Sequence, residues 1–219
     1  MHAVLLDFNG TRLFDSSLHL EAWSKIYQEL YPEDINSPNA SLFCGPRNDV
    51  ILQKIAPHLT AEERDRVSEH KEELYRQAYN QIPLKLVPGV EDFLDTLQQR
   101  GIPFGLASAS IKSNIDFFYR YFGLGRWFRL EDIVYDDGTY PDKGAMHLEA
   151  ARRLGAELSN CLLIEDSVSS IKLAQKNGAG CVVAIGSTSS RNELLSLGVH
   201  HFIQDFTEFD LSWLDIANA

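Results

Sequence analysis

Short apolar runs alternate with amphipathic helical segments over most of the chain. Four runs, each bounded by polar or glycine-containing turns, predict buried strands: Ala3–Leu6, Phe104–Ala107, Leu162–Ile164 and Val182–Ile185. None of the four alternates apolar with polar positions, as a half-exposed strand would. Because buried strands that alternate with helices are typical of βα units, we expect an α/β protein built on a parallel sheet.

The segments between these strands carry the apolar spacing of helices. The segment before Gly101 repeats apolar residues at helical intervals, and glycine commonly ends a helix. The same pattern predicts further helices over about residues 111–122, 145–154 and 168–176, each followed by a glycine. Ser190 and Glu193 have the spacing of a capping box, which predicts a short helix before Gly198.

The stretch from Asp15 to Pro83 differs, because helical spacing runs through it and no convincing strand interrupts it. Its apolar positions keep that spacing from Leu18 onward, and a capping box at Thr60 and Glu63 predicts the start of another helix. We therefore expect two domains: a core formed by residues 1–14 and 84–219, and an inserted helical domain formed by residues 15–83.

Composition narrows the class of protein. A chain of 219 residues, with 44% hydrophobic and 23% charged residues, is ordinary for a globular protein with a full core. The net charge of −11 argues against non-specific binding of nucleic acid, because no basic stripe offsets it. No apolar run approaches the length of a membrane span, and the first strand lacks the basic flank of a secretory signal.

The cysteines give no sign of a zinc site or a disulfide framework. Cys44, Cys161 and Cys181 lie far apart and form no CxxC pair. These features favour a reduced, cytoplasmic setting, with neither nucleic acid nor membrane as a partner.

Acidic residues directly follow two of the predicted strands. Asp7 follows the first strand, and Glu165 and Asp166 follow Leu162–Ile164. Parallel sheets bind ligands at the carboxyl ends of their strands, so these side chains are expected to gather there. Two carboxylates about 4 Å apart repel by about 4 kcal/mol, and a cation removes that repulsion. Helix capping would explain either group alone, but the two together favour a site for Mg²⁺, which prefers oxygen ligands and shares phosphate oxygens.

Two further residues have suitable places for phosphate binding. Ser108 follows the strand Phe104–Ala107 and precedes a predicted helix, whose free N–H groups are able to receive a phosphate. Lys143 begins the helix that leads towards Leu162–Ile164, where its charge would neutralise phosphate and restrain Asp7. In isolation, the serine is equally typical of a helix cap and the lysine of a solvated surface.

Taken in order, these residues resemble a known set of motifs. Asp7-Phe8-Asn9-Gly10-Thr11, Ser108, Lys143 and Glu165-Asp166 are similar to the four motifs of the haloacid dehalogenase-like superfamily. The resemblance covers essentially the whole chain and includes the phrases Phe14-Asp15-Ser16, Pro88-Gly89-Val90, Leu106-Ala107-Ser108-Ala109-Ser110 and Ile164-Glu165-Asp166-Ser167. The helical insertion resembles the cap of the β-phosphoglucomutase and phosphoglycolate phosphatase group. This resemblance implies a Rossmann-like core with an inserted helical cap.

The resemblance also implies a role for each matching residue. Asp7 would attack phosphorus and form an aspartyl phosphate. Mg²⁺ would be bound by Asp7, Asp166 and the backbone carbonyl of Asn9, with Glu165 supporting the metal shell. The phosphoryl group would be held by Thr11, Ser108, Ala109 and Lys143, and His19 matches a histidine of the cap that would meet the substrate. Apart from the resemblance, Arg47 is a cation in a loop of the cap, where it would read a distal phosphate or carboxylate of the substrate.

Three positions depart from the family pattern. Asn9 stands where a second aspartate is usual as the general acid/base, and such proton transfer contributes roughly 10²–10⁴-fold to rate. We expect weaker protonation of the leaving group and weaker activation of water, unless His19 takes over the proton transfer. Asn9 is either the native residue or one introduced to arrest turnover, and the sequence does not separate the two. Lys143 lies about two residues late relative to its helix and lacks the usual Lys-Pro-x-Pro-Asp phrase. Arg12 replaces an apolar residue, and no role for it follows from the sequence.

The predicted function is a Mg²⁺-dependent phosphatase that acts on a small phosphorylated metabolite, slowed by Asn9 and expected to be a monomer. A sugar-phosphate mutase is one alternative, although it needs both proton transfers that Asn9 weakens. A 2-haloacid dehalogenase needs no Mg²⁺, so Glu165 and Asp166 argue against it. From another class, a phosphometabolite-binding protein with little or no turnover fits the same residues. The natural substrate does not follow from this sequence.

Overall fold

The computed structural model describes residues 2–34, 40–43, 47–79, 85–187 and 189–215. The chain forms two compact units, Met1–Phe14 with Lys85–Ala219 and the intervening Asp15–Leu84. Residues 83 and 84, where the sequence analysis places the second domain boundary, lie outside the described residues.

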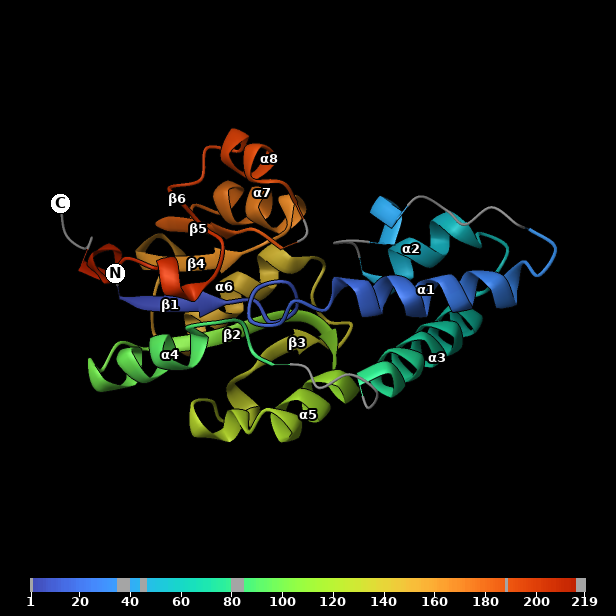
Figure 1. The fold of residues 1–219 in the computed structure, drawn as a ribbon, viewed down its shortest axis with the longest axis horizontal. Coiled ribbons are helices and arrows are strands. Elements are labelled where there is room, and N and C mark those ends of the chain that lie inside the picture. The colour runs from blue at the N-terminus through green and yellow to red at the C-terminus, as the bar shows by residue number, and fades with distance from the viewer. Residues whose placement is uncertain (1, 35–39, 44–46, 80–84, 188, 216–219) are drawn as a thin grey trace. The chain divides into compact units, whose positions relative to one another are not determined.

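The first unit is built on a six-stranded parallel sheet in the order β3-β2-β1-β4-β5-β6 (Figure 1). The central strand β1 pairs with β2 on one side and with β4 on the other, so that Leu6 lies opposite both Leu106 and Ile164. This arrangement confirms the predicted α/β, Rossmann-like fold. The strands are β1 Ala3–Leu6, β2 Phe104–Ile111, β3 Val134–Asp136, β4 Cys161–Glu165, β5 Cys181–Ile185 and β6 His201–Ile203.

Two features of the sheet differ from the sequence prediction. The strands β3 and β6 were not predicted, because each has three residues, too few to show a hydrophobic period. The strand β2 continues through Ser108 to Ile111, so Ser108 does not immediately precede a helix, which begins only at Lys112. The predicted end of this strand at Ala107 was therefore wrong, and the role of Ser108 in binding phosphate stays a prediction.

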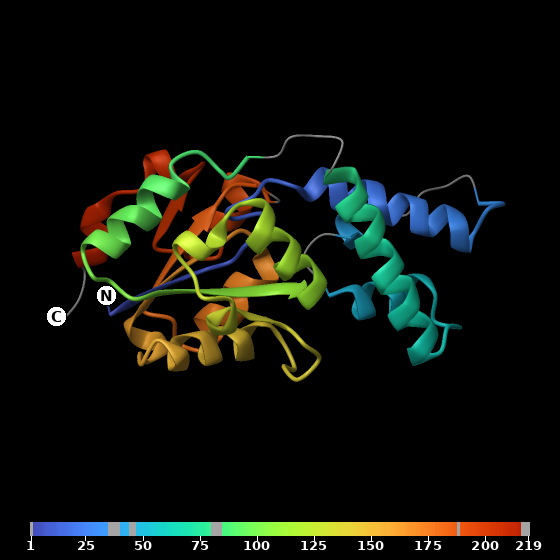
Figure 2. The same ribbon diagram turned by 90° about the horizontal axis from the view of Figure 1, so that it is seen from below.

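Helices cover both faces of the sheet (Figure 2). On one face lie α4 Val90–Gln99 and α5 Lys112–Tyr121, and on the other lie α6 Lys143–Arg153, α7 Val168–Lys176 and α8 Arg191–Ser196. The latter helices bury Met146, Ile171 and Leu194 against the sheet. Short 3₁₀ helices complete the unit: Leu124–Arg126, Leu130–Asp132, Leu158–Asn160, Phe206–Glu208 and Leu211–Asp215.

The second unit is helical throughout its described part, as predicted. It contains α1 Ser16–Leu30, the 3₁₀ helix Ala40–Phe43, α2 Asn48–Ile55 and α3 Ala61–Tyr79. Its apolar core contains Trp23, Ile26, Phe43, Ile51 and Leu52. The capping box at the start of α3 is confirmed: the Thr60 amide donates to Glu63 Oε2 at 2.8 Å, and the Glu63 amide donates to Thr60 Oγ1 at 3.3 Å.

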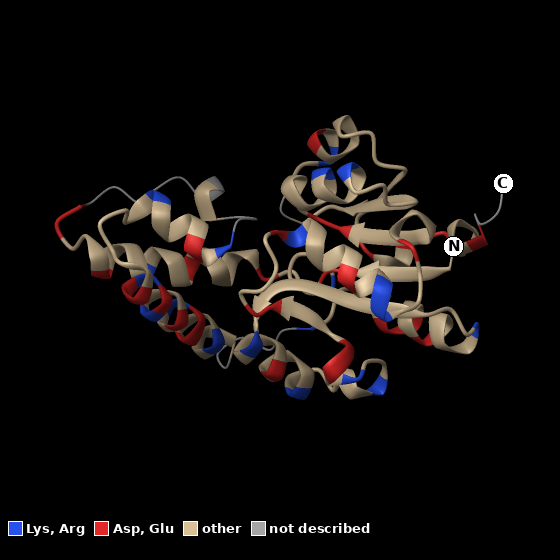
Figure 3. Cartoon of the chain, turned by 180° about the vertical axis from the view of Figure 1, so that it is seen from behind, with Lys and Arg blue, Asp and Glu red and all other residues tan. Residues whose placement is uncertain are grey.

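Charged residues of both signs are interleaved along α3, the most highly charged helix (Figure 3). Two of its charged residues, Lys71 and Glu72, are buried and pair with each other at 2.8 Å. Within the part of the chain that the structure describes, no helix has both the length and the apolarity needed to span a membrane.

Candidate active site

Asp7 leaves the carboxyl end of β1 and is followed by a tight loop. Inside this loop the Arg12 amide donates to the Phe8 carbonyl at 2.8 Å, and the Gly10 amide donates to the Leu13 carbonyl at 2.7 Å. Gly10 has a φ of +74°, and a Cβ atom at this position would clash with the carboxylate of Asp166. Glycine is therefore required here both by the turn and by the acidic side chain beside it.

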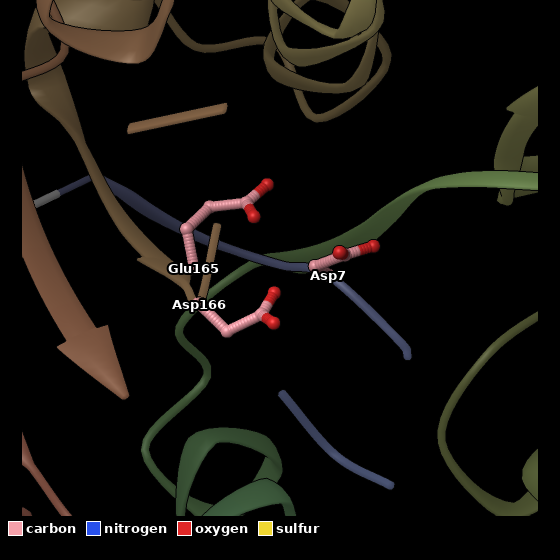
Figure 4. Close-up of side chains that lie close together, drawn as sticks. All are labelled: Asp7, Glu165 and Asp166. Carbon is pink, nitrogen blue, oxygen red and sulfur yellow. The ribbon is translucent and has the colours of Figure 1, made fainter. Parts of the chain in front are cut away.

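Three carboxylates meet at the ends of two neighbouring strands (Figure 4). Asp7 follows β1, while Glu165 ends β4 and Asp166 follows it; one oxygen from each lies within 4.8 Å of the others. Glu165 and Asp166 are buried. The pairing of β1 with β4 brings these side chains together, as the sequence analysis predicts for the carboxyl ends of parallel strands.

Lys143 opens α6 and reaches into the same cluster. Its Nζ lies 2.6 Å from Asp7 Oδ1 and 3.7 Å from Glu165 Oε1. Burial alone would lower the pKa of Lys143, but the charges of Asp7 and Glu165 outweigh burial and raise it. The late position of this lysine relative to its helix therefore does not prevent contact with Asp7.

The pKa values of Asp7 and Glu165 shift in opposite directions. Burial raises the pKa of Asp7 to about 6, and the ammonium of Lys143 opposes that rise. Burial also raises the pKa of Glu165, but Lys143 and a hydrogen bond from His147 outweigh it and lower that pKa. Both side chains are thus ionised at neutral pH.

The chemistry of this cluster fits a hard divalent cation. Glu165 Oε2 is buried and, among the described residues, has no hydrogen-bond partner. Such an atom is costly unless something else binds it, and its neighbours here are further carboxylate oxygens. An oxygen-only donor set with an excess of negative charge suits Mg²⁺.

Comparison with known proteins agrees with this arrangement. A family model described as haloacid dehalogenase-like hydrolase matches residues 1–178. The chain belongs to this family of hydrolases. A haloacid dehalogenase-like hydrolase domain-containing protein of Arabidopsis thaliana is 25% identical over 92% of this chain, which spans 63% of that relative's length.

Solved structures of haloacid dehalogenase-like proteins share the fold. A family IA, variant 3 hydrolase from Entamoeba histolytica superposes with a TM-score of 0.91 at 30% identity, covering 98% of each chain. A β-phosphoglucomutase from Clostridium difficile superposes with a TM-score of 0.80 at 22% identity, covering 98% of this chain and 96% of that one. The resemblance to the capped group of the superfamily, predicted from the sequence motifs, is confirmed at the level of the fold.

The residues expected to hold a phosphoryl group differ in burial and in hydrogen bonding. Thr11 is buried, and its Oγ1 has no hydrogen-bond partner within the described part of the chain. Ser108 is also buried, and its Oγ accepts a hydrogen bond from the Ser110 amide at 3.2 Å. Ala109, between Ser108 and Ser110 on β2, is partly exposed. The roles of Thr11, Ser108 and Ala109 in holding a phosphoryl group stay predictions.

Arg12 is the residue whose environment the sequence did not reveal. Its side chain is only 1% exposed, and its guanidinium carbon lies 4.8 Å from the Phe8 ring centroid and 4.7 Å from that of Phe128. Among the described residues, its Nε and Nη2 have no hydrogen-bond partner. Burial lowers the pKa of Arg12 to about 9, and the charge of Asp7 opposes this effect.

His19 and Arg47, expected to contact substrate, belong to the second unit. His19 Nδ1 lies 2.7 Å from Lys71 Nζ, and its ring stacks on Tyr75 with centroids 4.0 Å apart. Its Nε2 lies 3.4 Å from Asp15 Oδ2, as expected for residues one helical turn apart. Arg47 precedes α2 and pairs with Asp49 at 3.2 Å. The roles of His19 and Arg47 in binding substrate stay predictions.

Sequence analysis missed two polar residues that contact the site. His147 lies one turn after Lys143 on α6 and bonds Glu165 at 2.8 Å. Ser187 donates to Asp166 Oδ2 at 3.1 Å. The spacing between Lys143 and His147 is a usable signal, because residues four apart share a helix face. For Ser187 the sequence offers no signal beyond its place after β5.

Proposed function

We propose that this protein is a Mg²⁺-dependent phosphatase acting on a small phosphorylated metabolite through an aspartyl-phosphate intermediate. The observation that carries the proposal is the place of Asp7, whose Oδ1 lies 2.6 Å from Lys143 Nζ while its carboxylate belongs to the three-carboxylate cluster. An anionic nucleophile needs such cations to approach a negatively charged phosphate.

Asp7 has the properties of the nucleophile. Its pKa of about 6 leaves the carboxylate ionised at neutral pH. Attack by a carboxylate oxygen on phosphorus would form an acyl phosphate and release the leaving group, and water would then hydrolyse that intermediate. Lys143 and Thr11 would hold the phosphoryl oxygens during transfer. A Mg²⁺ ion held by Asp7, Asp166 and the Asn9 carbonyl, with Glu165 in support, would neutralise charge on the phosphoryl group.

Asn9 limits the chemistry that this site performs efficiently. A carboxamide cannot transfer a proton to a leaving group near neutral pH, so esters of good leaving groups are favoured over those of alcohols. The same limitation argues against a mutase, which must protonate and deprotonate sugar hydroxyls in each cycle. The lack of proton transfer at Asn9 is compatible with the other candidate function, a phosphometabolite-binding protein with little turnover, because ligand binding requires no proton transfer.

The test measures Mg²⁺-dependent phosphate release from p-nitrophenyl phosphate, whose leaving group needs little acid assistance. We expect activity in the wild type, none after EDTA treatment, and none in Asp7→Asn. Asp92→Asn removes an exposed carboxylate from α4 of the same unit and is the matched control, with unchanged activity. Mass spectrometry of quenched protein is expected to find the phosphoryl group on the peptide that contains Asp7.

The outcomes separate the candidate functions. Absence of both phosphate release and phosphorylated Asp7, in wild-type protein that binds inorganic phosphate with Mg²⁺, would favour the binding protein. A panel of phosphorylated metabolites would then identify the substrate or ligand. In that panel, His19→Ala and Arg47→Ala are expected to raise KM for the natural substrate more than for p-nitrophenyl phosphate, because both are proposed to contact the part of the substrate beyond the phosphate.

A further inference from the structure

His147 is a buried polar residue to which the proposed reaction assigns no role. It lies on α6 with 1% of its surface exposed, among the apolar residues that this helix packs against the sheet. Its Nδ1 is buried and has no hydrogen-bond partner among the described residues. Its Nε2 lies 2.8 Å from Glu165 Oε1 and 3.5 Å from Ser170 Oγ. The short contact to Glu165 is therefore the main interaction that compensates for burying this ring.

The direction of this hydrogen bond follows from the chemistry of its partner. An ionised carboxylate only accepts hydrogen bonds, so Nε2 carries the hydrogen and donates it to Glu165 Oε1. This bond fixes one oxygen of Glu165. The other oxygen, Oε2, belongs to the same buried carboxylate and has no partner within the described residues. A carboxylate held by one oxygen presents the other in a defined direction, as metal sites require.

Glu165 Oε1, the oxygen that accepts from His147, also lies near the ammonium of Lys143. Lys143 Nζ lies 3.7 Å from Glu165 Oε1 but 2.6 Å from Asp7 Oδ1. Coulomb attraction falls with distance, so the ammonium is bound chiefly to Asp7. If His147 were absent, Oε1 would lose this donor in a buried place, and the ammonium of Lys143, 3.7 Å away, would be drawn towards it.

We infer that His147 is a positioning residue: its hydrogen bond orients Glu165 for the divalent cation and leaves Lys143 to Asp7. This inference rests on the proposed function, since it assigns a cation to the carboxylate cluster. His147 touches neither the reacting atoms nor the ion and acts through Glu165. A residue that orients a metal-binding carboxylate typically changes metal affinity by about 10–100-fold when removed.

The test uses three substitutions in the full-length protein. His147→Gln places an amide N–H where Nε2 lies and keeps the donor to Glu165. His147→Asn has the same chemistry but is one carbon shorter and does not reach. Met146→Ala removes a buried side chain from the same helix without touching the carboxylates, and it controls for loss of packing. Mg²⁺ dissociation constants are measured by calorimetry without substrate, and inorganic phosphate affinity is measured at saturating Mg²⁺.

We expect the Mg²⁺ dissociation constant to rise about 10–100-fold in His147→Asn and to stay within about threefold of wild type in His147→Gln. Met146→Ala is expected to lower the melting temperature without changing Mg²⁺ affinity. Phosphate affinity is expected to fall in His147→Asn, because Lys143 is then shared with Glu165. Equal Mg²⁺ affinity in His147→Asn and His147→Gln would overturn the inference, as would an equal loss in Met146→Ala.

The result is distinguishable from a failure of the proposed function. If wild-type protein releases phosphate while both His147 variants bind Mg²⁺ like wild type, only the role of His147 is wrong. If wild-type protein binds no Mg²⁺ at all, the metal site and the role of His147 are both wrong. Should His147→Asn fail to fold, His147→Leu, which also lacks the donor, is compared with His147→Gln by the same criteria.

Discussion

Ser110 Oγ donates a hydrogen bond to Asn9 Oδ1 over 2.7 Å, which connects the end of β2 to the loop that follows Asp7. The residue in the place of the family's usual proton donor is thus held by a serine hydroxyl. A carboxylate at position 9 would accept the same hydrogen bond, because both side chains present an oxygen there. The site therefore retains the support that an aspartate would need.

This relationship leads to a prediction for Asn9→Asp. The variant is expected to hydrolyse esters of alcohols, such as sugar phosphates, roughly 10²–10⁴-fold faster than wild type, since it restores a group able to transfer a proton. Activity on p-nitrophenyl phosphate should change far less, because its leaving group departs as an anion. Measuring kcat/KM for both classes in both proteins tests this. Equal gains on the two classes would mean that position 9 affects binding rather than proton transfer.

Gly10→Ala tests the close approach of the loop to Asp166. A methyl group here would clash with the Asp166 carboxylate, in addition to straining a φ of +74°. We expect Mg²⁺ affinity to fall at least about tenfold, together with a loss of stability. Gly101→Ala is the matched control, because Gly101 has a φ of +65° and nothing within 4 Å of the added atom. The control should lose stability but keep Mg²⁺ affinity, as measured by calorimetry and thermal unfolding.

Arg12→Met is expected to stabilise the protein. Burial of a guanidinium with two nitrogens lacking acceptors among the described residues is costly, and contacts with the rings of Phe8 and Phe128 offset that cost in part. Methionine fills similar space without charge, so the free energy of unfolding should rise by about 1–4 kcal/mol in urea titrations. Arg129→Met, at an exposed residue, should change it by less than about 1 kcal/mol. A less stable Arg12→Met would indicate that the buried charge is itself required.

The depressed pKa of Glu72 leads to a prediction of how acid lowers the stability of the second unit. Burial alone would raise the pKa of Glu72, but the charges of Lys71 and His19 and a hydrogen bond from Asn48 lower it to about 2. Because the folded pKa is depressed, the ionised side chain stabilises the fold above its usual pKa of 4.5, and this contribution disappears as the pH falls towards about 2. The contribution is about 3 kcal/mol.

Comparison of wild type with Glu72→Gln at several pH values tests this sign. Wild type should be more stable than the variant at pH 6, and the difference in urea midpoint should shrink as the pH falls below about 4.5. A difference that does not depend on pH would show that the carboxylate charge contributes nothing and that only its hydrogen bonds matter. Glu73→Gln, at the exposed neighbouring position, provides the control with little effect at any pH.

Several parts of the site were predictable from residues alone. Asp7, Glu165 and Asp166 were expected to meet because each follows a buried run, and parallel strands end at the same edge of a sheet. Thr60 and Glu63 were recognised as a helix start because a capping box depends only on neighbours in the chain. In contrast, the apolar run predicts a strand that ends at Ala107, whereas pairing with β3 extends the strand through Ser108 to Ile111.

Hydrophobic period and local capping are properties of short segments, so the residues alone predict the four longest strands, the helical insertion and the carboxylates gathered at the strand ends. The hydrogen bonds from Lys143 to Asp7, 136 positions away, and from His147 to Glu165 become visible only in the folded chain. The same holds for the burial of Arg12 against the rings of Phe8 and Phe128. These contacts depend on how α6 and the Asp7 loop pack on the sheet, and packing across such separations leaves no periodic trace in one chain.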